Sequence, residues 1–398
     1  MPRWIRHTAR LTGLVVLGFA LPAGAADKSG PWNLVQLKQT PEATWGETKE
    51  GVQEVLYEGE PFEGHPTHVF AYYARPQEGD GPFPAVLLVH GGGGKAFAEW
   101  VRLWADRGYA ALAMDLAGHG ADGQRLPDGG PEQDDRAKFR SFTDDEVDQM
   151  WTYHAVAAVI RGGSLLASRE EVDAGRLGIT GISWGGYLTC IVAGLDDRLK
   201  VAVPVYGCGY LAEDSVWKPT FDRMSADQRQ RWVDNFDPSN YLPNVRCPIL
   251  FINGTNDYSY PLDSWQKSYR LVPGRVDLCL KLRMPHSHPD GWAPEEIGIY
   301  VDSILQDGRP PASIERARLR GNRAVARFTA AVPIMRAEAH FAVASGPWNK
   351  RGWQTASAVH TEDTVSVELP AARPLAYYLS ITDGRGAQMT TQHEILEE

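Results

Sequence analysis

The sequence predicts an α/β fold, with a mostly parallel sheet flanked by helices, followed by a C-terminal β-sandwich domain. Between residues 69 and 305, short apolar runs typical of strands alternate with stretches of helical periodicity. The segment Gly308-Arg309-Pro310-Pro311 interrupts this alternation. From Ala312 onward, apolar residues recur at every second position, which is typical of antiparallel strands with one buried face.

The individual elements follow from apolar runs bounded by Gly- and Pro-rich turns. Strands are expected at 69–74, 84–89, 109–116, 177–182, 201–206, 248–253 and 277–283, and helices at 96–107, 143–158, 187–193, 262–271 and 294–305. About seven short strands are expected after Ala312. The predicted domains are therefore residues 26–310 and 311–398. A polar loop over 118–142 is long enough to cover a site.

Residues 1–25 are typical of a secretory signal peptide. Three arginines precede an apolar run from Leu11 to Leu21, and Ala23-Gly24-Ala25 provides a small-residue cleavage site. A retained membrane anchor is the alternative, although the run is short for a bilayer span. We expect an exported protein, periplasmic or extracellular, with no membrane association once this segment is removed.

The charge of the chain excludes some partners. Its 40 basic and 50 acidic residues give a net charge of −10, and loss of the three arginines in the signal peptide leaves 37 against 50, or −13. No basic cluster is visible that could neutralise phosphates, so nucleic acid is not an expected partner. The oligomeric state cannot be read from the sequence.

The cysteines give no sign of a metal site. There are four, each within or beside an apolar stretch: Cys190, Cys208, Cys247 and Cys279. No Cys-x-x-Cys or Cys/His spacing of a metal centre occurs, and no metal or cofactor is expected. Buried thiols are the favoured interpretation. A disulfide stays open, since export would permit one.

Gly181-Ile182-Ser183-Trp184-Gly185 is the motif around which the chain is organised. An apolar strand leads into it and a helical stretch leaves it, which is the strand–turn–helix context of a nucleophilic serine. Small residues on either side let strand and helix approach closely. In a chain with 40 glycines, the alternative is a chance match in an ordinary turn.

An acid and a base follow in the order that a serine nucleophile needs. Asp257 comes directly after the strand 248–253, and His286 directly after the strand 277–283. His286 would take the proton of Ser183, and Asp257 would hold and stabilise the imidazole. His288 is the rival base, and His286 is preferred because it is nearer the strand end. A helix-capping role for Asp257 is the alternative there.

Four glycines follow His90 at the end of an early strand. Backbone N–H groups in such a turn can face a developing oxyanion, so Gly91 and Gly92 are predicted donors together with Trp184. A phosphate-binding loop is the alternative interpretation. It lacks the required Lys-Ser/Thr, because Ala96 follows Lys95.

These motifs resemble the α/β-hydrolase superfamily, in the branch of dienelactone hydrolases, prolyl-oligopeptidase-type domains and bacterial acetyl xylan esterases. The resemblance spans about residues 65–307, and includes Asp115-Leu116-Ala117-Gly118-His119-Gly120 and Gly254-Thr255-Asn256-Asp257. It implies the α/β-hydrolase fold. Ser183 departs from the cysteine of dienelactone hydrolases, and no propeller precedes the domain. Trp184 and Ser287 replace the Gln and Glu of one acetyl xylan esterase type.

Three functions compete. The first is a secreted serine hydrolase of carboxylic esters acting through an acyl-enzyme, with small-molecule or carbohydrate esters such as acetylated xylan as substrates. The second is a prolyl-oligopeptidase-like serine peptidase acting on small peptides. The third is a binding protein on a hydrolase scaffold, which an intact triad disfavours. Five tryptophans could form a sugar-stacking floor, with plain packing as the better interpretation for any single one: Trp184, Trp217, Trp232, Trp265 and Trp292.

The β-domain offers no Ser-His-Asp set of its own, so it is expected to do no chemistry. Trp348 and Trp353 flank a turn, and were they exposed they would suit a carbohydrate platform. Docking against the catalytic domain is the favoured interpretation of the same two residues.

Overall fold

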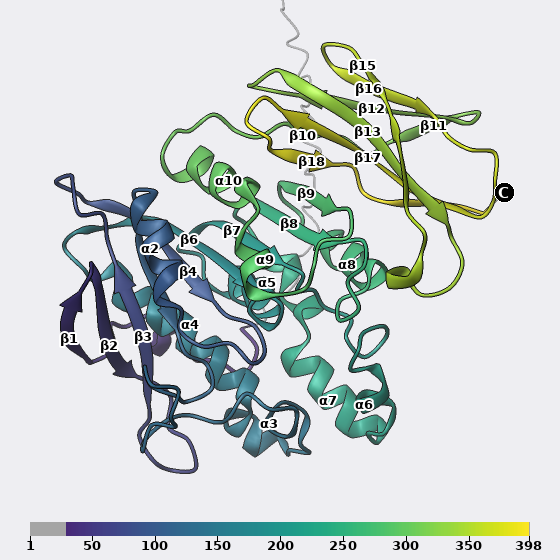
Figure 1. Ribbon diagram of the computed structural model, residues 1–398. Helices are drawn as coiled ribbons and strands as arrows, with labels where there is room; N and C mark the ends of the chain where they lie inside the picture. Colours follow the sequence, from purple (N-terminus) through teal and green to yellow (C-terminus); the bar gives the residue numbers. More distant parts are fainter. Residues whose placement is uncertain (1–28, 398) are drawn as a thin grey trace, which may run out of the picture.

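The computed structural model describes residues 29–397, which form one large mixed sheet and two smaller antiparallel sheets (Figure 1). The predicted signal peptide lies outside the described residues. Among residues 29–397, each helix is too short or too polar to cross a bilayer.

The large sheet has nine strands in the order β1-β2-β3-β5-β4-β6-β7-β8-β9. Their bounds, from β1 to β9, are Ala43–Lys49, Val52–Glu58, His68–Ala74, Phe83–Val89, Ala110–Met114, Val172–Ile182, Leu199–Val205, Ile249–Gly254 and Val276–Lys281. The first three strands and β5 pair antiparallel, and the strands from β5 to β9 pair in parallel. The strands β4, β5 and β8 are buried on both faces, as parallel strands between helix layers must be.

All seven strands predicted in this part of the chain are present, and the α/β fold class is confirmed. The strands β1 and β2 were not predicted, because their residues mix polar and apolar types without strict alternation. Both lie at the margin of the sheet, where one face of each strand meets water. Trp45 of β1 packs edge-on against Tyr73 of β3.

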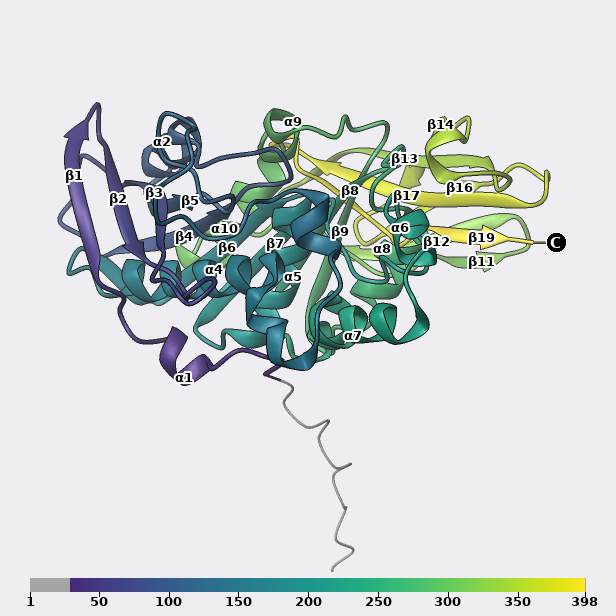
Figure 2. The same ribbon diagram turned by 90° about the horizontal axis from the view of Figure 1, so that it is seen from below.

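Helices cover both faces of the large sheet. The α-helices α1 to α10 are Leu34–Leu37, Ala98–Asp106, Asp135–Phe139, Trp151–Ala167, Trp184–Leu195, Lys218–Asp222, Ala226–Phe236, Leu262–Tyr269, His288–Trp292 and Glu295–Leu305, and the 3-10 helices η1 to η4 are Asp144–Gln149, Pro238–Asn240, Leu242–Asn244 and Trp348–Lys350. In Figure 2, α2 lies on one side of the sheet and α4 and α5 lie on the other. The Arg107 guanidinium at the end of α2 donates two hydrogen bonds to Asp302 of α10, which holds these two helices together.

The C-terminal strands form two five-stranded antiparallel sheets, as the predicted β-sandwich requires. One sheet contains β10, β11, β12, β15 and β16, and the other contains β13, β14, β17, β18 and β19. From β10 to β19 the bounds are Ser313–Ile314, Arg318–Arg320, Arg323–Thr329, Ile334–Val343, Gln354–Ser357, Val359–His360, Thr364–Glu368, Leu375–Asp383, Gln388–Thr390 and Glu394–Leu396. The ten strands exceed the predicted seven, because several span only two or three residues. The predicted domain boundary at 310/311 falls between α10 and β10 and stays a prediction.

The turn with two tryptophans lies against the large-sheet unit. Trp348 and Trp353 are only 5% and 4% exposed, so the exposure that a carbohydrate platform needs is absent and that expectation is wrong. The Trp348 indole donates to an Asp263 carboxylate oxygen at 2.8 Å, and Arg283 donates to the Trp353 carbonyl at 3.1 Å. These contacts support the docking interpretation.

The two edges of the large sheet differ in their surroundings. At β9, the Leu280 N–H donates to the Thr390 hydroxyl of β18 at 3.1 Å, so the C-terminal unit covers this edge. The Gln388 N–H donates to the buried Glu296 carboxylate of α10 close by. At the other edge, β1 is largely exposed, and its pairing with β2 is interrupted by a register shift between Trp45 and Thr48. One edge is therefore covered by the chain itself, and the other is exposed and irregular.

All four cysteines are buried, and all are free thiols. Burial raises the pKa of the Cys247 thiol to about 11 and raises the pKa of Cys190 further still. The favoured prediction of buried thiols is thus confirmed, and none of the four carries the character of a reactive thiolate.

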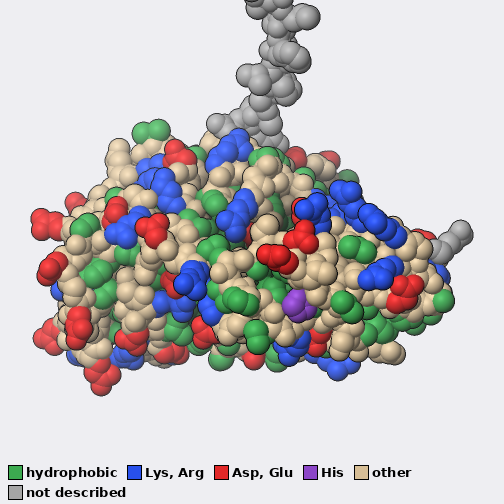
Figure 3. Space-filling view, turned by 90° about the horizontal axis from the view of Figure 1, so that it is seen from above, with side chains coloured by type: hydrophobic (Ala, Val, Ile, Leu, Met, Phe, Trp, Pro, Cys, Tyr) green, Lys and Arg blue, Asp and Glu red, His purple; other side chains and the backbone are tan. Residues whose placement is uncertain are grey.

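Charged side chains are unevenly spread on the face shown in Figure 3. Acidic side chains crowd its left end, over the large-sheet unit, whereas Lys and Arg side chains form a row at the upper right, over the C-terminal sheets. The net negative charge of the chain is therefore not shared evenly along its length.

Candidate active site

Ser183 lies in a sharp turn between β6 and α5. Its φ of 58° and ψ of −117° are unusual for a residue with a side chain, and its N–H donates to the Val205 carbonyl at 2.9 Å. The glycines beside it have no room for a Cβ. At Gly185 an added Cβ would lie 1.9 Å from the Val89 carbonyl oxygen, and at Gly181 it would lie 2.2 Å from a backbone oxygen of the helix. The motif is thus small because β4, β6 and α5 meet there.

The structure brings Ser183, His286 and Asp257 together at the carboxyl edge of the sheet. The Ser183 hydroxyl lies 2.9 Å from His286 Nε2, and His286 Nδ1 lies 2.6 Å from an Asp257 carboxylate oxygen. The Asp257 carboxylate lies on the loop that follows β8, and the His286 ring lies on the loop that follows β9, as the order of the motifs predicts. The three groups form one continuous chain of hydrogen bonds.

Asp257 is 3% exposed and is held by backbone groups. Its other carboxylate oxygen accepts the N–H groups of Ser259 and Tyr260, at 2.9 and 2.7 Å. These bonds hold the carboxylate in place and aim it at the imidazole. The alternative role of Asp257 as a simple helix cap does not account for its contact with His286.

Tyr206 packs against the face of the His286 imidazole and was not predicted as part of the site. Its ring stacks on His286 with centroids 4.3 Å apart, and its hydroxyl donates to the Pro285 carbonyl at 2.5 Å. Burial, and then the charge of Asp257, raises the pKa of this tyrosine, so it stays neutral. Its place at the end of the strand predicted over 201–206 was the available signal, since that end reaches the same edge of the sheet.

His288, the rival base, is engaged elsewhere. Its Nε2 accepts the Gly91 N–H at 3.0 Å. The hydrogen bond to Ser183 comes from His286. The same contact corrects the prediction for Gly91, because an N–H already donated to an imidazole is not free for an oxyanion. Gly92 and Trp184 lie side by side, since a Cβ on Gly92 would meet Trp184 Cδ1 at 3.0 Å.

The expected sugar-stacking floor is not formed by the five tryptophans. Trp184 is 2% exposed, and Trp232 and Trp265 are completely buried, so these three pack in the interior. Trp217 and Trp292 are half-buried. Plain packing, the favoured interpretation for any single tryptophan, explains most of the set.

The loop 118–142 packs against Trp184 through α3. Lys138 on α3 is 4% exposed, with its ammonium 4.7 Å from the centre of the Trp184 ring. Burial lowers the pKa of this lysine, while Asp135 opposes the shift. The loop therefore helps to hold the residue that follows Ser183, a role that its polar sequence did not reveal.

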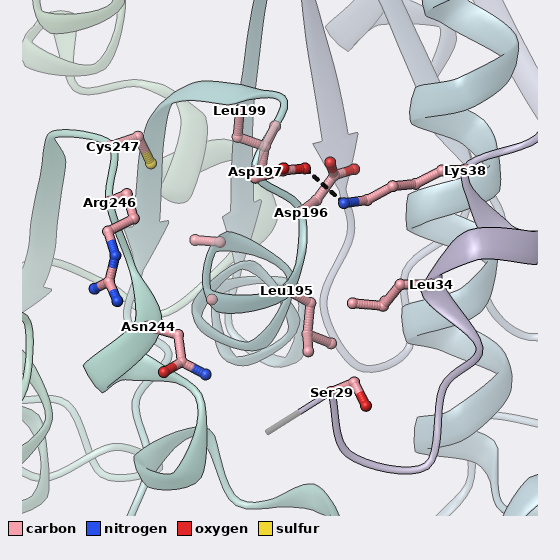
Figure 4. A pocket seen from close by; sticks show the side chains of 12 residues that line it. Ser29, Leu34, Lys38, Leu195, Asp196, Asp197, Leu199, Asn244, Arg246 and Cys247 are labelled. Carbon is pink, nitrogen blue, oxygen red and sulfur yellow. Dashed lines mark hydrogen bonds and ion pairs between the residues drawn. The ribbon is translucent and has the colours of Figure 1, made fainter. Parts of the chain in front are cut away.

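A pocket of about 290 Å³ lies away from these residues, at the C-terminal end of α5 (Figure 4). Its lining includes an ion pair in which Lys38 donates to Asp197 at 2.5 Å. Ser183 is at the other end of this 12-residue helix, about 18 Å away at 1.5 Å per residue. The pocket is thus separate from the candidate active site.

Comparison with known proteins gives consistent relatives. Residues 46–238 match the family model described as acetyl xylan esterase. Acetyl esterase Axe7A of Xylanibacter ruminicola is 26% identical over 216 residues, which are 48% of this chain and 46% of that protein. A protein of Escherichia coli strain K12, named as a carboxymethylenebutenolidase, is 30% identical over 243 residues, covering 60% of this chain and 78% of that one. The chain thus spans about half the length of the first relative and most of the second.

Among solved structures, an acetyl xylan esterase from Paenibacillus sp. R4 superimposes with a TM-score of 0.56 at 23% identity. The superposition covers 69% of this chain and 92% of that one. At this identity the likeness concerns the fold.

Proposed function

The chain belongs to the α/β-hydrolase superfamily, in the branch of acetyl xylan esterases and dienelactone hydrolase-like enzymes, and from this premise we propose that it is an exported serine esterase of acetylated carbohydrates. Enzymes of this branch hydrolyse carboxylic esters. The catalytic residues that we propose are Ser183, His286 and Asp257. The observation that carries the proposal is their continuous chain of hydrogen bonds, at 2.9 and 2.6 Å.

In the first half of the reaction, the Ser183 hydroxyl attacks the ester carbonyl while His286 Nε2 accepts its proton. Asp257 accepts the Nδ1–H throughout, which fixes the tautomer that leaves Nε2 free and stabilises the imidazolium. The carbonyl oxygen becomes an oxyanion beside the N–H groups of Gly92 and Trp184. His286 then gives its proton to the departing alcohol, and an acyl-serine remains.

In the second half, water takes the place of the alcohol. His286 accepts a proton from the water as it attacks the acyl-serine, and returns a proton to Ser183 as the acid leaves. The same groups therefore serve both steps.

The surroundings of Ser183 favour a short acyl group. Trp184 and Tyr187 beside the serine are fully packed, and Tyr206 and Tyr260 fill the neighbouring loops with no exposed surface. Bulky buried side chains of this kind leave little depth beyond the reacting carbonyl. A screen of p-nitrophenyl esters should give a kcat/KM that falls steeply from acetate to butyrate and hexanoate.

The alcohol side offers an exposed ring. Tyr258 is 55% exposed, and its centroid lies 5.7 Å from that of His286. Since His286 protonates the departing alcohol, a group beside His286 contacts the alcohol part of the substrate. Val216 adds 44% exposed apolar surface next to it, where its N–H donates to the Ser259 carbonyl. A flat apolar face suits the stacking of a sugar ring.

The decisive experiment combines labelling with a substrate series. Wild-type protein should form a fluorophosphonate adduct at Ser183 and release acetate from acetylated xylo-oligosaccharides. Ser183→Ala should do neither, and Ser357→Ala, at an exposed serine of β14, should behave as wild type. A wild type that hydrolyses none of the esters would refute the proposal.

The same material tests the remaining alternatives. Faster turnover of dipeptide p-nitroanilides than of acetyl esters would favour the peptidase. For the sugar contact, Tyr258→Ala should raise KM for acetylated oligosaccharides about tenfold while leaving ethyl acetate hydrolysis within twofold, and Tyr258→Phe should resemble wild type. Equal effects on both substrates would exclude a sugar contact.

Export and the role of the β-domain belong to the same proposal. Export is supported by the pattern of residues 1–25, and mass spectrometry of the secreted protein should find a new N-terminus at Ala26. The β-domain is proposed to stabilise the catalytic domain, which the contacts of Trp348 and Trp353 support.

A further inference from the structure

The backbone N–H and carbonyl of Gly91 are hydrogen-bonded to two histidines that the mechanism leaves unused. We infer that His288, together with His90, is a positioning residue that fixes the glycine loop so that Gly92, and not Gly91, presents its N–H to the oxyanion. This inference rests on the proposed esterase function and adds to it a requirement for a neutral, hydrogen-bond-accepting group at position 288.

The directions of the hydrogen bonds follow from the backbone groups. The Gly91 N–H can only donate, so His288 Nε2 at 3.0 Å must be an unprotonated acceptor. The Gly91 carbonyl can only accept, so His90 Nδ1 at 2.7 Å is a donor. His90 Nε2 accepts the Leu116 N–H at 2.9 Å, which agrees with that tautomer. The N–H and the carbonyl of Gly91, which belong to two successive peptide groups, are thereby both held by neutral imidazoles.

The environment keeps both rings neutral. Burial, followed by the proximity of His90, lowers the pKa of His288 to about 4, and burial likewise lowers the pKa of His90. The Phe97 ring covers His288, with centroids 5.0 Å apart. An imidazolium at either position would turn the acceptor nitrogen into a donor and break the contact.

Three of the four glycines, Gly91, Gly92 and Gly94, have a steric explanation in this arrangement. A Cβ at Gly94 would lie 2.6 Å from His288 Nε2 and 2.7 Å from His90 Nδ1. A Cβ at Gly91 would lie 2.9 Å from Ser183 Cβ. The glycines therefore let two imidazoles and the serine turn converge on the loop.

The geometry leaves Gly92 as the donor. Within the described part of the chain, its N–H meets no acceptor, in contrast to that of Gly91. Gly92 also lies against Trp184, whose N–H begins the helix after Ser183. A donor that is free, adjacent to Trp184 and held through its neighbour is what an oxyanion requires.

His288 also links the two halves of the site. It begins α9 only two residues after His286, so one short segment carries His286 to Ser183 and His288 to the glycine loop. A displacement of this segment would move the base and the oxyanion donors together.

The test compares substitutions that differ in one property, the ability to accept a hydrogen bond. In His288→Gln the amide oxygen can reach the place of Nε2, whereas His288→Leu and His288→Met have a similar size without a comparable acceptor. His65→Leu, at an exposed histidine whose backbone pairs with Phe62, is the matched control. Each protein is assayed with p-nitrophenyl acetate for kcat and KM, and its melting temperature is measured.

We expect His288→Leu to lower kcat about 100-fold, as loss of an oxyanion donor does, with KM within threefold of wild type. His288→Gln should recover kcat to within tenfold of wild type. Fluorophosphonate labelling should slow in the same order, and His65→Leu should match wild type.

Three results would overturn the inference. One is a kcat of His288→Leu within threefold of wild type, and another is equal loss in the Leu and Gln variants. The third is that both apolar variants fail to fold, while the Gln variant folds but its kcat is no higher than its fraction of folded protein accounts for. Position 288 would then be purely structural. A wild-type protein without esterase activity would instead refute the proposed function, so the two failures are distinguishable.

Discussion

Replacing Ser183 with glycine should abolish hydrolysis and, at the same time, stabilise the fold. The backbone of Ser183 has φ 58° and ψ −117°, where the Cβ of an ordinary residue crowds the adjoining peptide groups. Strain of this kind costs about 1–3 kcal/mol. Glycine relieves it, because it has no Cβ. Ser183→Ala removes the hydroxyl but keeps the Cβ, so the alanine variant is the matched comparison.

The expected difference in unfolding free energy between Ser183→Gly and Ser183→Ala follows from two opposing effects. Relief of strain favours the folded glycine variant by about 1–3 kcal/mol, whereas the greater freedom of glycine in the unfolded chain opposes it by about 0.4–1 kcal/mol relative to alanine. The hydrogen bond from the residue's N–H to the Val205 carbonyl is a backbone contact and is retained. Ser183→Gly should therefore exceed Ser183→Ala in unfolding free energy by about 1–2 kcal/mol, with a melting temperature on the order of 2–4 °C higher.

The assay is urea unfolding followed by tryptophan fluorescence, together with thermal melts, for wild type and both variants. Neither variant should hydrolyse p-nitrophenyl acetate. The same pair of substitutions at Ser357, which has an ordinary backbone conformation, should give the reverse order, with alanine the more stable. If Ser183→Gly is no more stable than Ser183→Ala, the turn is not strained and the reasoning fails.

Three further predictions concern packing and pH. Gly185→Ala places a Cβ 1.9 Å from the last carbonyl of β4 and should cost on the order of 3 kcal/mol or more in urea unfolding, whereas Gly352→Ala, with open space around its Cβ, should change little. Burial lowers the pKa of His393 to about 3 from its ordinary 6.5, so the unfolded chain binds a proton that the folded chain excludes. The contribution of His393 to the unfolding free energy should thus fall by up to about 1.4 kcal/mol per pH unit as the pH drops below about 6.5, and urea curves at pH 7, 6 and 5 should show a shallower fall in His393→Asn than in wild type. Trp348→Ala should lower the unfolding free energy by about 3–5 kcal/mol, while Asp263→Asn, whose amide oxygen still accepts the indole N–H, should stay within 1 kcal/mol of wild type; equal losses would contradict the packing argument.

The central strands and helices could be predicted because their apolar runs are long and their turns are explicit. The strand 84–89 and the helix 262–271 are of this kind, and the structure has them at Phe83–Val89 and Leu262–Tyr269. The strands β1 and β2 were not predicted. An antiparallel strand at the margin of a sheet can form its backbone hydrogen bonds without a run of apolar residues, so its sequence gives no clear pattern. The short strands of the C-terminal unit were undercounted for a related reason: two- and three-residue pairings leave no periodicity.

The order of Ser183, Asp257 and His286 along the chain predicted their meeting, because each follows a strand whose end reaches one edge of a parallel sheet. The partners that surround them could not be predicted. The stacking of Tyr206 on His286 and the contact of Gly91 with His288 depend on loop paths that leave no local pattern. The burial of Trp348 likewise depends on a contact with Asp263, which is 85 residues away in sequence.

The cover over β9 has a consequence for how the chain is made. Leu280 and Thr390 are separated by 110 residues, so the ribosome releases the strand long before the segment that shields it. During that interval the growing polypeptide carries an open strand edge, able to pair with neighbouring nascent chains. Covering of the β9 edge must therefore await synthesis of β18. A stop codon between α10 and Thr390 should yield an aggregating product, even though every proposed catalytic residue has already been synthesised.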